Sequence, residues 1–481
     1  MSIGRRATRF GALACVVALA AGACGSDGGD EEAAPTTAKG TATTAAAGAG
    51  PDDPSTWGVK DKKLTGPAGF SVDLSKCPAK WDDKTGLTDT EIRIGASMAQ
   101  SGSFAVYGPI SQGMKAYFDH INTTEGGIAG RKINFNLKDD GYEAARGKAN
   151  VDELLETGNL FAFSGTLGTP IVMATNDKVN EACVPNISVS TAHPAWGDPV
   201  NRPWTTATTQ LNYSSEALLW GDYILKKYGK GVTVAALAIN SEFGAAYRVT
   251  FEKWAKDNGV TLKTELHDPA APSITNEMTT LAATNADVII LMTASGYCTQ
   301  AVKYMEESTW KPKERLISNT CASVSFFKPA GFGAGNGWVS ISDRRDPADP
   351  TDQKEEIIKL TRDLATKNGV DPNLGAWAAG VAQMGWHTVD VLKDAAKLNG
   401  GLTRTNLMIA SRNISKTHPF YRPGIKYEMK GNLDAFPSEG GVTVKYTVEA
   451  GKETGVNVPF GEVLDLNGKT PNCAWDGKQC K

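Results

Sequence analysis

The chain has 481 residues, more than one hydrophobic core usually supports, so two lobes or domains are expected. Its formal net charge is −3 and it has no long run of basic residues, which makes nucleic acid a poor candidate partner.

The N-terminus has the pattern of an export signal. Three arginines precede a short apolar segment at 10–20, and small residues then lead to Cys24. The apolar segment is too short to cross a bilayer comfortably, which argues against a membrane span. An ordinary signal peptide is the other alternative, but small residues that end at a cysteine resemble a lipobox, whose cysteine is acylated. We therefore predict a signal peptide at 1–23 and lipidation of Cys24.

Two segments of different composition follow. Residues 24–56 are rich in Ala, Thr, Gly and Asp and have scarcely any large apolar side chains, so they cannot bury enough surface to fold. They are predicted to form a flexible tether between the lipid and the folded body. Residues 57–89 contain Trp57, Phe70 and Trp81, and we expect part of this N-terminal extension to pack on the body.

From residue 92 onward, strand-like and helix-like segments alternate. The predicted strands cover 92–98, 132–139, 160–164, 185–190, 232–239, 261–267, 287–293 and 315–319. The predicted helices cover 110–121, 142–157, 171–180, 212–228, 243–258, 273–284, 297–307, 352–368 and 374–398. Polar and apolar residues alternate again within 421–448, which predicts further β-structure. This order of elements indicates an α/β fold whose parallel sheets carry helices on both faces.

Cysteine usage suggests disulfides. Of the eight cysteines, Cys15 leaves with the signal peptide and Cys24 takes lipid. An even set remains, which is typical of exported proteins that form disulfides. Six cysteines allow about fifteen pairings, and spacing alone does not decide among them. Our hypothesis pairs Cys473 with Cys480, Cys298 with Cys321 and, by elimination, Cys77 with Cys183.

Three motifs near the start of the body resemble those of a known family. They are Ile92-Arg93-Ile94-Gly95, then Ser101-Gly102 followed by Ala105 and Tyr107-Gly108, and finally Gly126-Gly127-Ile128 followed by Gly130 and Ile133. In this order they are similar to the opening of the branched-chain amino-acid type of solute-binding protein, the receptor lipoproteins of ABC importers. The resemblance extends over roughly residues 92–463.

The resemblance implies the fold of type I periplasmic binding proteins, in which two doubly wound parallel-sheet lobes are joined by three crossovers. It places lobe 1 at 90–207 and 342–420, and lobe 2 at 208–341 and 421–463. It does not explain the extension at 57–89 or the C-terminal tail at 464–481.

The loop at 165–170 is the most informative part of the expected ligand site. It lies between a strand end and a helix start, with Thr169 at the N-cap position and Pro170 at the first helical position. Free N–H groups and the helix dipole suit a carboxylate there. The alternative is that Thr169 only caps its own helix and does not contact the ligand. The resemblance implies that this loop takes the ligand's carboxylate, with Thr166, Leu167 and Thr169 as candidate contacts.

Other loops supply the remaining candidate contacts. The resemblance implies a second recognition loop with Ser190 and Thr191, whereas the nearby His193 is expected to be structural. The candidates from the first ligand loop and from the second lobe are Ser101, Tyr107, Phe243, Tyr297 and Thr320. Phe243 is expected to cover the ligand as the lobes close, and Tyr297 could equally pack in the core.

The expected ligand differs from that of amino-acid-binding members of the family. They place an acidic residue after the strand that ends near Asn319, where it pairs with the ligand's ammonium. Here residues 319–323 read Asn-Thr-Cys-Ala-Ser, with no carboxylate. An unpaired ammonium in a closed cleft costs several kcal/mol. An α-amino acid is therefore disfavoured, and a carboxylate without the amine, an amide or another small polar molecule fits better.

Motifs of enzymes and metal sites do not occur. The sequence has no H-E-x-x-H, no G-x-S-x-G, no Walker A loop and no zinc-spaced Cys/His set, so we predict no catalytic residue, metal or cofactor. The resemblance implies a receptor that is lipid-anchored to the outer face of the bacterial cytoplasmic membrane. It would close around a small solute and pass it to an ABC importer permease, and we expect it to be a monomer. A ligand-sensing receptor subunit and an exported hydrolase are the rival interpretations.

Overall fold

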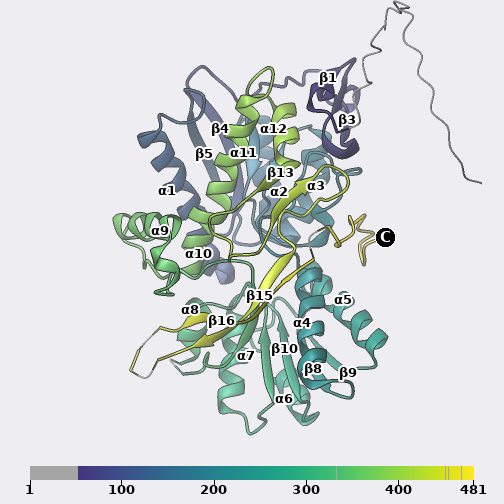
Figure 1. Ribbon diagram of the computed structural model, residues 1–481, viewed down its shortest axis with the longest axis vertical. Helices are drawn as coiled ribbons and strands as arrows, with labels where there is room; N and C mark the ends of the chain where they lie inside the picture. The colour runs from purple at the N-terminus through teal and green to yellow at the C-terminus, as the bar shows by residue number, and fades with distance from the viewer. Residues whose placement is uncertain (1–51, 332, 450, 453, 467) are drawn as a thin grey trace, which may run out of the picture. The chain divides into compact units, whose positions relative to one another are not determined.

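The computed structural model describes residues 52–481 except 332, 450, 453 and 467. The predicted signal peptide, Cys24 and tether residues 24–51 lie outside the described residues. The described residues from 52 onward belong to one compact unit, within which two sheets are the centres of two lobes (Figure 1). Of the helices described, none combines the length and the apolar character that a membrane crossing requires.

The first lobe contains a parallel four-stranded sheet in the order β5-β4-β6-β7. Its strands are β4 (Glu91–Met98), β5 (Lys132–Asp139), β6 (Ala162–Ser164) and β7 (Asn186–Ile187). Its helices are α1 (Pro109–Thr124), α2 (Ala144–Glu156), α3 (Thr169–Glu181), α9 (Glu356–Lys367), α10 (Gly375–Ala378), the π-helical η8 (Ala379–Gly385), α11 (Trp386–Lys397) and α12 (Arg404–Ser411). Ile92 and Ile94 of β4 are fully buried, as their alternation predicts.

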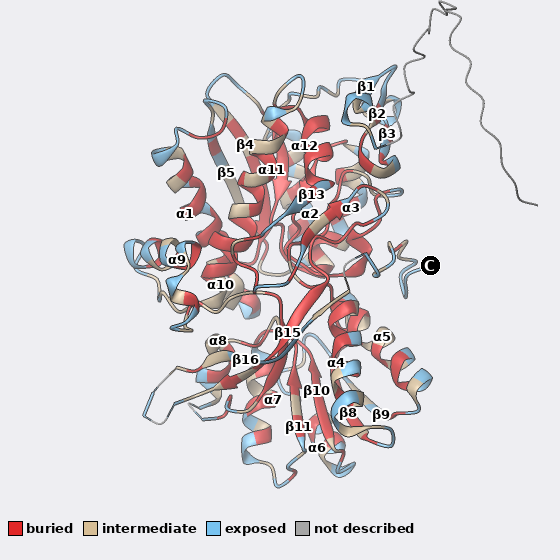
Figure 2. Cartoon of the chain, in the orientation of Figure 1, coloured by how far each residue is buried: buried red, intermediate tan, exposed pale blue. Residues whose placement is uncertain are grey.

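The second lobe contains a seven-stranded sheet in the order β16-β15-β12-β11-β10-β8-β9. Its strands are β8 (Thr233–Ile239), β9 (Thr261–His267), β10 (Val288–Met292), β11 (Glu314–Ile317), β12 (Val339–Ser342), β15 (Gly440–Thr447) and β16 (Val456–Asp465). Its helices are α4 (Tyr213–Tyr228), α5 (Glu242–Asn258), α6 (Thr275–Ala283), α7 (Gly296–Glu307) and α8 (Val324–Phe327). The sheet is not wholly parallel as predicted, because β15 and β16 are consecutive strands joined by a short connection and pair antiparallel. Figure 2 shows the buried residues concentrated along the central strands.

The boundary predicted at residue 421 lies too early. β13 (Asn413–Lys416) pairs with β14 (Tyr427–Lys430), and Tyr427 is buried against His387 of the first lobe. Residues 421–430 therefore stay with the first lobe, because their apolar side chains belong to its core. The chain returns to the second lobe only between β14 and β15.

Asp343 ties the three interlobe crossovers together. Its buried carboxylate accepts hydrogen bonds from Leu211 N at 2.8 Å, on the first crossover, and from Ser438 Oγ at 3.4 Å, on the third. Asp343 itself follows β12 and begins the second crossover. Hydrogen bonds of this one side chain therefore join the three crossovers.

The N-terminal extension packs on the first lobe. It begins earlier than predicted, since Asp52 accepts a hydrogen bond from Ala68 N at 2.9 Å. Its three-stranded antiparallel sheet consists of β1 (Gly58–Lys60), β2 (Lys63–Thr65) and β3 (Ser71–Asp73). Trp81 Nε1 donates to Cys183 O at 2.7 Å, and the Asp83 carboxylate accepts from Thr405 N at 2.8 Å.

All three hypothesised disulfides are present: Cys77–Cys183, Cys298–Cys321 and Cys473–Cys480. The last closes a C-terminal tail that contacts both lobes. Ser215 of α4 shares a hydrogen bond with Thr470 at 3.2 Å, whereas Cys473 N donates to Gly197 O of the first lobe at 2.8 Å.

Candidate functional site

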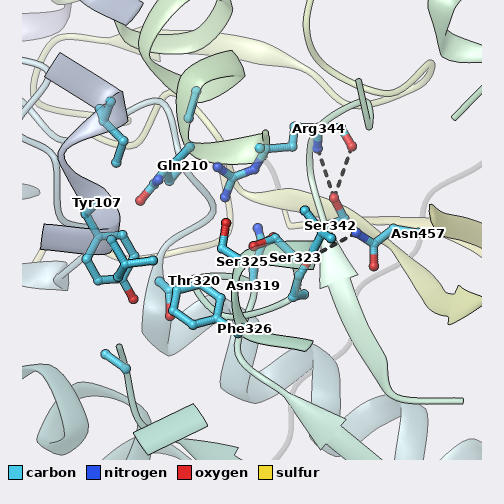
Figure 3. A pocket seen from close by; sticks show the side chains of 18 of the residues that line it. Tyr107, Gln210, Asn319, Thr320, Ser323, Ser325, Phe326, Ser342, Arg344 and Asn457 are labelled. Atoms are coloured by element: carbon cyan, nitrogen blue, oxygen red, sulfur yellow. Dashed lines mark hydrogen bonds between the residues drawn. The ribbon is translucent and has the colours of Figure 1, made fainter. Parts of the chain in front are cut away.

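A pocket lies between the two lobes. Its volume is about 1250 Å³, which includes open solvent at its entrance. Loops at the carboxyl ends of strands from both sheets form its walls, as expected for α/β folds. Figure 3 shows part of its lining. The predicted residues that line it are Tyr107, Leu167, Thr169, Ser190, Thr191, Phe243 and Thr320.

The two recognition loops of the first lobe meet at Thr169 and Thr191. Their Oγ1 atoms lie 2.7 Å apart in a hydrogen bond, and both residues are buried. Thr169 is not the N-cap that we predicted, because α3 begins at Thr169 and Gly168 precedes it with φ +102°. A side chain at Gly168 would meet the Tyr142 ring at 2.5 Å, which explains the glycine. The Thr169 hydroxyl is therefore not used for helix capping.

Hydrogen bonds join the two lobes next to the pocket. The 3₁₀ helix η4 (Gly102–Tyr107) follows β4, and the Tyr107 hydroxyl accepts from Ser295 N of the second lobe at 3.1 Å. Ser295 Oγ donates to Ser103 O at 2.5 Å. Burial raises the pKa of Tyr107 above its ordinary value, so this hydroxyl stays protonated at neutral pH. The two lobes are therefore in contact beside Tyr107, which lines the pocket.

Aromatic side chains form one end of the pocket. Phe104 stacks on Tyr142 with ring centroids 3.7 Å apart, and Tyr107 lies 5.8 Å from Phe326 of the second lobe. Phe243 packs edge-on against Tyr213 at 4.8 Å. This end of the pocket suits an apolar group of a solute.

Three predicted contacts do not line the pocket. Ser101 is exposed, and its hydroxyl donates to Asp139 at 2.6 Å instead of facing the pocket. Thr166 is buried behind the loop, because its backbone carbonyl pairs with Ser190 N. The Tyr297 hydroxyl donates to Pro269 O at 2.7 Å, so this side chain holds the loop after β9.

The crossovers supply residues that the sequence analysis missed. Gln210 precedes α4, and Arg344 follows β12; both line the pocket, as Asn457 of β16 also does. The run of four charged residues at 343–346, directly after a buried strand, was the available signal for Arg344. Gln210 has no such signal.

Two buried ionisable groups near the pocket are structural. Glu216 of α4 does not line it: burial raises its pKa to about 8, although hydrogen bonds from Tyr247 and Asn319 oppose the shift. His193 accepts a hydrogen bond from Ala195 N through Nδ1 at 3.1 Å, as expected for a structural histidine. Burial lowers the pKa of His193 to about 3, so it is neutral. No group of three or more His, Cys, Asp or Glu within the described part of the chain could hold a metal ion.

Comparison with known families gives a match over most of the body. Residues 91–435 match the family model described as "Periplasmic binding protein". The N-terminal extension and the C-terminal tail fall outside that match. Among curated proteins, none matches the chain significantly.

Solved structures share the fold. The fatty acid ABC transporter substrate-binding protein from Thermomonospora curvata superposes with a TM-score of 0.68 at 20% identity, over 82% of this chain and 98% of that one. A branched chain amino acid ABC transporter from Thermus thermophilus with bound valine gives 0.68 at 17% identity, over 78% and 98%. A possible leucine/isoleucine/valine-binding protein from Rhodopirellula baltica SH 1 gives 0.65 at 14% identity, over 79% and 98%. Similarity at this level establishes the common two-lobed fold.

Proposed function

Because the chain belongs to the periplasmic binding protein family, we propose that it is an extracytoplasmic solute-binding protein of an ABC importer. It captures a small polar solute between its lobes and delivers it to a membrane permease. The observation that carries this proposal is a pocket lined by both lobes, which are joined next to it by hydrogen bonds of Tyr107 and Ser103 with Ser295. A solute that contacts both walls stabilises the closed arrangement by its differential affinity for that state.

The proposal includes a lipid anchor at Cys24 on the outer face of the cytoplasmic membrane, with the following residues as a tether. The small residues before that cysteine and the composition of 24–51 support it. The receptor acts as a monomer, without a cofactor and without a covalent step. Two similar structures are named for solutes that carry a carboxylate, a fatty acid and valine, which supports a carboxylate or a related polar group in the solute.

Replacing Thr169 and Thr191 together by valine should weaken solute binding roughly 2- to 10-fold, because a hydrogen bond to a neutral polar group of the solute contributes about 0.5–1.5 kcal/mol. The two hydroxyls bond to each other at 2.7 Å, and the buried Tyr213 hydroxyl, which also bonds to Thr191, keeps its hydrogen bond with the Ala192 backbone. The free energy of unfolding should therefore change little. A thermal-shift screen of small carboxylates, amides, amino acids and sugars identifies the solute, and calorimetry measures its affinity.

The matched control is Thr175→Val, a buried threonine of α3 whose hydroxyl bonds to Ile171 O and does not line the pocket. It should bind the solute as the unmodified protein does. Equal affinity in the Thr169→Val/Thr191→Val variant would contradict the role of these hydroxyls. No stabilisation by any solute would contradict the proposed function, since a ligand at 100 times its dissociation constant adds about 2.7 kcal/mol.

A further inference from the structure

Arg344 lines the pocket, and other residues of the protein accept hydrogen bonds from only some of the donors of its guanidinium. Its Nε pairs with Asp343 at 3.2 Å, and its Nη1 donates to Gln383 Oε1 at 3.1 Å. No described residue accepts a hydrogen bond from its Nη2. Because the side chain is only 16% exposed, an acceptor supplied by a solute would complete the hydrogen bonding of this guanidinium.

The other charged residues of the pocket wall are held by the protein itself. Arg345 Nη1 pairs with Asp352 at 3.0 Å, and Arg422 donates to Asn457 O at 3.1 Å and pairs with Asp352. The Asp346 carboxylate accepts hydrogen bonds from both N and Nδ2 of Asn457, at 2.9 and 3.2 Å. Among the described residues that line the pocket, Arg344 is therefore the charged side chain best placed to take a solute's ionic group.

Neutral donors face the same part of the pocket. Figure 3 shows the Arg344 guanidinium extending toward the Gln210 amide, with Ser325 on the facing wall. The Ser325 hydroxyl is buried and has no hydrogen-bond partner among the described residues, and none of them bonds to the Gln210 side chain. An amide and a hydroxyl beside a guanidinium can donate to the same anion.

Two aromatic rings lie near this polar cluster. In Figure 3, Tyr107 and Phe326 lie below the Gln210 amide and the Arg344 guanidinium, with Thr320 beside Phe326. The neighbouring carboxylate, Glu216, is turned toward Asn319 N and Tyr247 and lies outside the pocket lining. An α-ammonium next to a carboxylate bound here would lie close to the Arg344 guanidinium, and the two like charges repel.

We infer that Arg344, with Gln210 and Ser325, forms an anion subsite that selects a carboxylate solute with an apolar body and no α-ammonium. The inference rests on the proposed function and names the solute class of the same pocket. The carboxylate accepts hydrogen bonds from Arg344 Nη2 and the two neutral donors, and the apolar body lies against Tyr107 and Phe326. The Asp343 carboxylate accepts a hydrogen bond from Arg344 Nε and so fixes the position of the guanidinium.

Calorimetry with four matched probes tests it: 3-phenylpropanoate, 3-phenylpropanamide, 3-phenylpropylamine and L-phenylalanine. We expect 3-phenylpropanoate to bind at least tenfold more tightly than each of the other three. Arg344→Gln should cut its affinity tenfold or more and leave that of the amide unchanged, and Arg344→Lys should restore part of it. Arg248→Gln on α5 is the matched control for charge, since Arg248 pairs with Glu252 and does not line the pocket.

Gln210→Glu is a second variant that tests the subsite with Arg344 in place. It is needed because replacing Arg344 removes its bond to Asp343, which also holds the hinge. It adds a negative charge to the subsite without removing any hydrogen bond described for Gln210, and it should weaken 3-phenylpropanoate binding tenfold or more. The inference is overturned if L-phenylalanine or the amide binds as well as 3-phenylpropanoate, if neither variant changes the affinity, or if 3-phenylpropanoate does not bind while other solutes do. If no solute of any class binds, the proposed function fails with it.

Discussion

Glu216→Gln should make the protein more stable than the unmodified chain at pH 8 and about equally stable near pH 4.5. Burial raises the pKa of Glu216 from 4.5 to about 8, so between these values the folded state holds a proton that the unfolded state has released. The free energy of unfolding therefore falls as the pH rises through that window, by roughly 4–5 kcal/mol in total at about 1.4 kcal/mol per pH unit. Glutamine imitates the protonated carboxyl, since it can accept from Asn319 N and donate to the Tyr247 hydroxyl.

Urea denaturation of both proteins at several pH values between 4 and 9 measures this difference. The control is Glu252→Gln, which removes a partly exposed carboxylate of α5 and should leave the pH profile almost unchanged. Parallel profiles for Glu216→Gln and the unmodified protein would show that Glu216 is ionised in the folded state, and our account of this buried carboxyl behind the pocket would then be wrong.

Replacing Cys77 and Cys183 by serine should lower the free energy of unfolding by about 5 kcal/mol, from the entropy of the loop that the bridge closes. The bridge spans 106 residues and joins the N-terminal extension to the loop before β7. Its loss should also release the extension, because Trp81 is held by Cys183 O next to the bridge. Denaturant unfolding gives the stability, and limited proteolysis reports on the extension.

Removal of Cys473–Cys480 is the comparison for this variant. That bridge spans only 7 residues, so the same chain-entropy relation gives about 2 kcal/mol. Equal losses for the two bridges, or a smaller loss for Cys77–Cys183, would mean that the extension is held by its side-chain contacts and not by the covalent link.

Elements with a strong local pattern could be predicted from the sequence. β5 and β9 have the predicted bounds, because polar and apolar residues alternate along most of their length. The helix predicted over 374–398 is interrupted by the π-helical η8, where Gly380 touches Ile110 O of α1 so closely that a Cβ would lie 2.0 Å away. That irregularity depends on a neighbour remote in the chain, and periodicity does not report it.

The candidate site also has residues that could be predicted from the sequence and residues that could not. Thr169 and Thr191 follow strand ends and could be found because parallel strands present their carboxyl ends at one edge of a sheet. Arg344 and Gln210 lie on crossovers, and their approach depends on the bond from Leu211 N to Asp343. The sequence pattern marks each segment as irregular but does not indicate that they meet.

The distance between the lobes, with and without solute, is the most direct test of the central claim. Spin labels on non-cysteine amino acids at Lys148 of α2 and Lys256 of α5, both exposed, keep the native disulfides intact. Electron–electron double resonance should show a shorter, narrower distance distribution when the solute from the thermal-shift screen saturates the protein. Thr169→Val/Thr191→Val should need a correspondingly higher solute concentration for the same change. A distribution that stays the same while calorimetry shows the solute bound would contradict capture by closure of the two lobes.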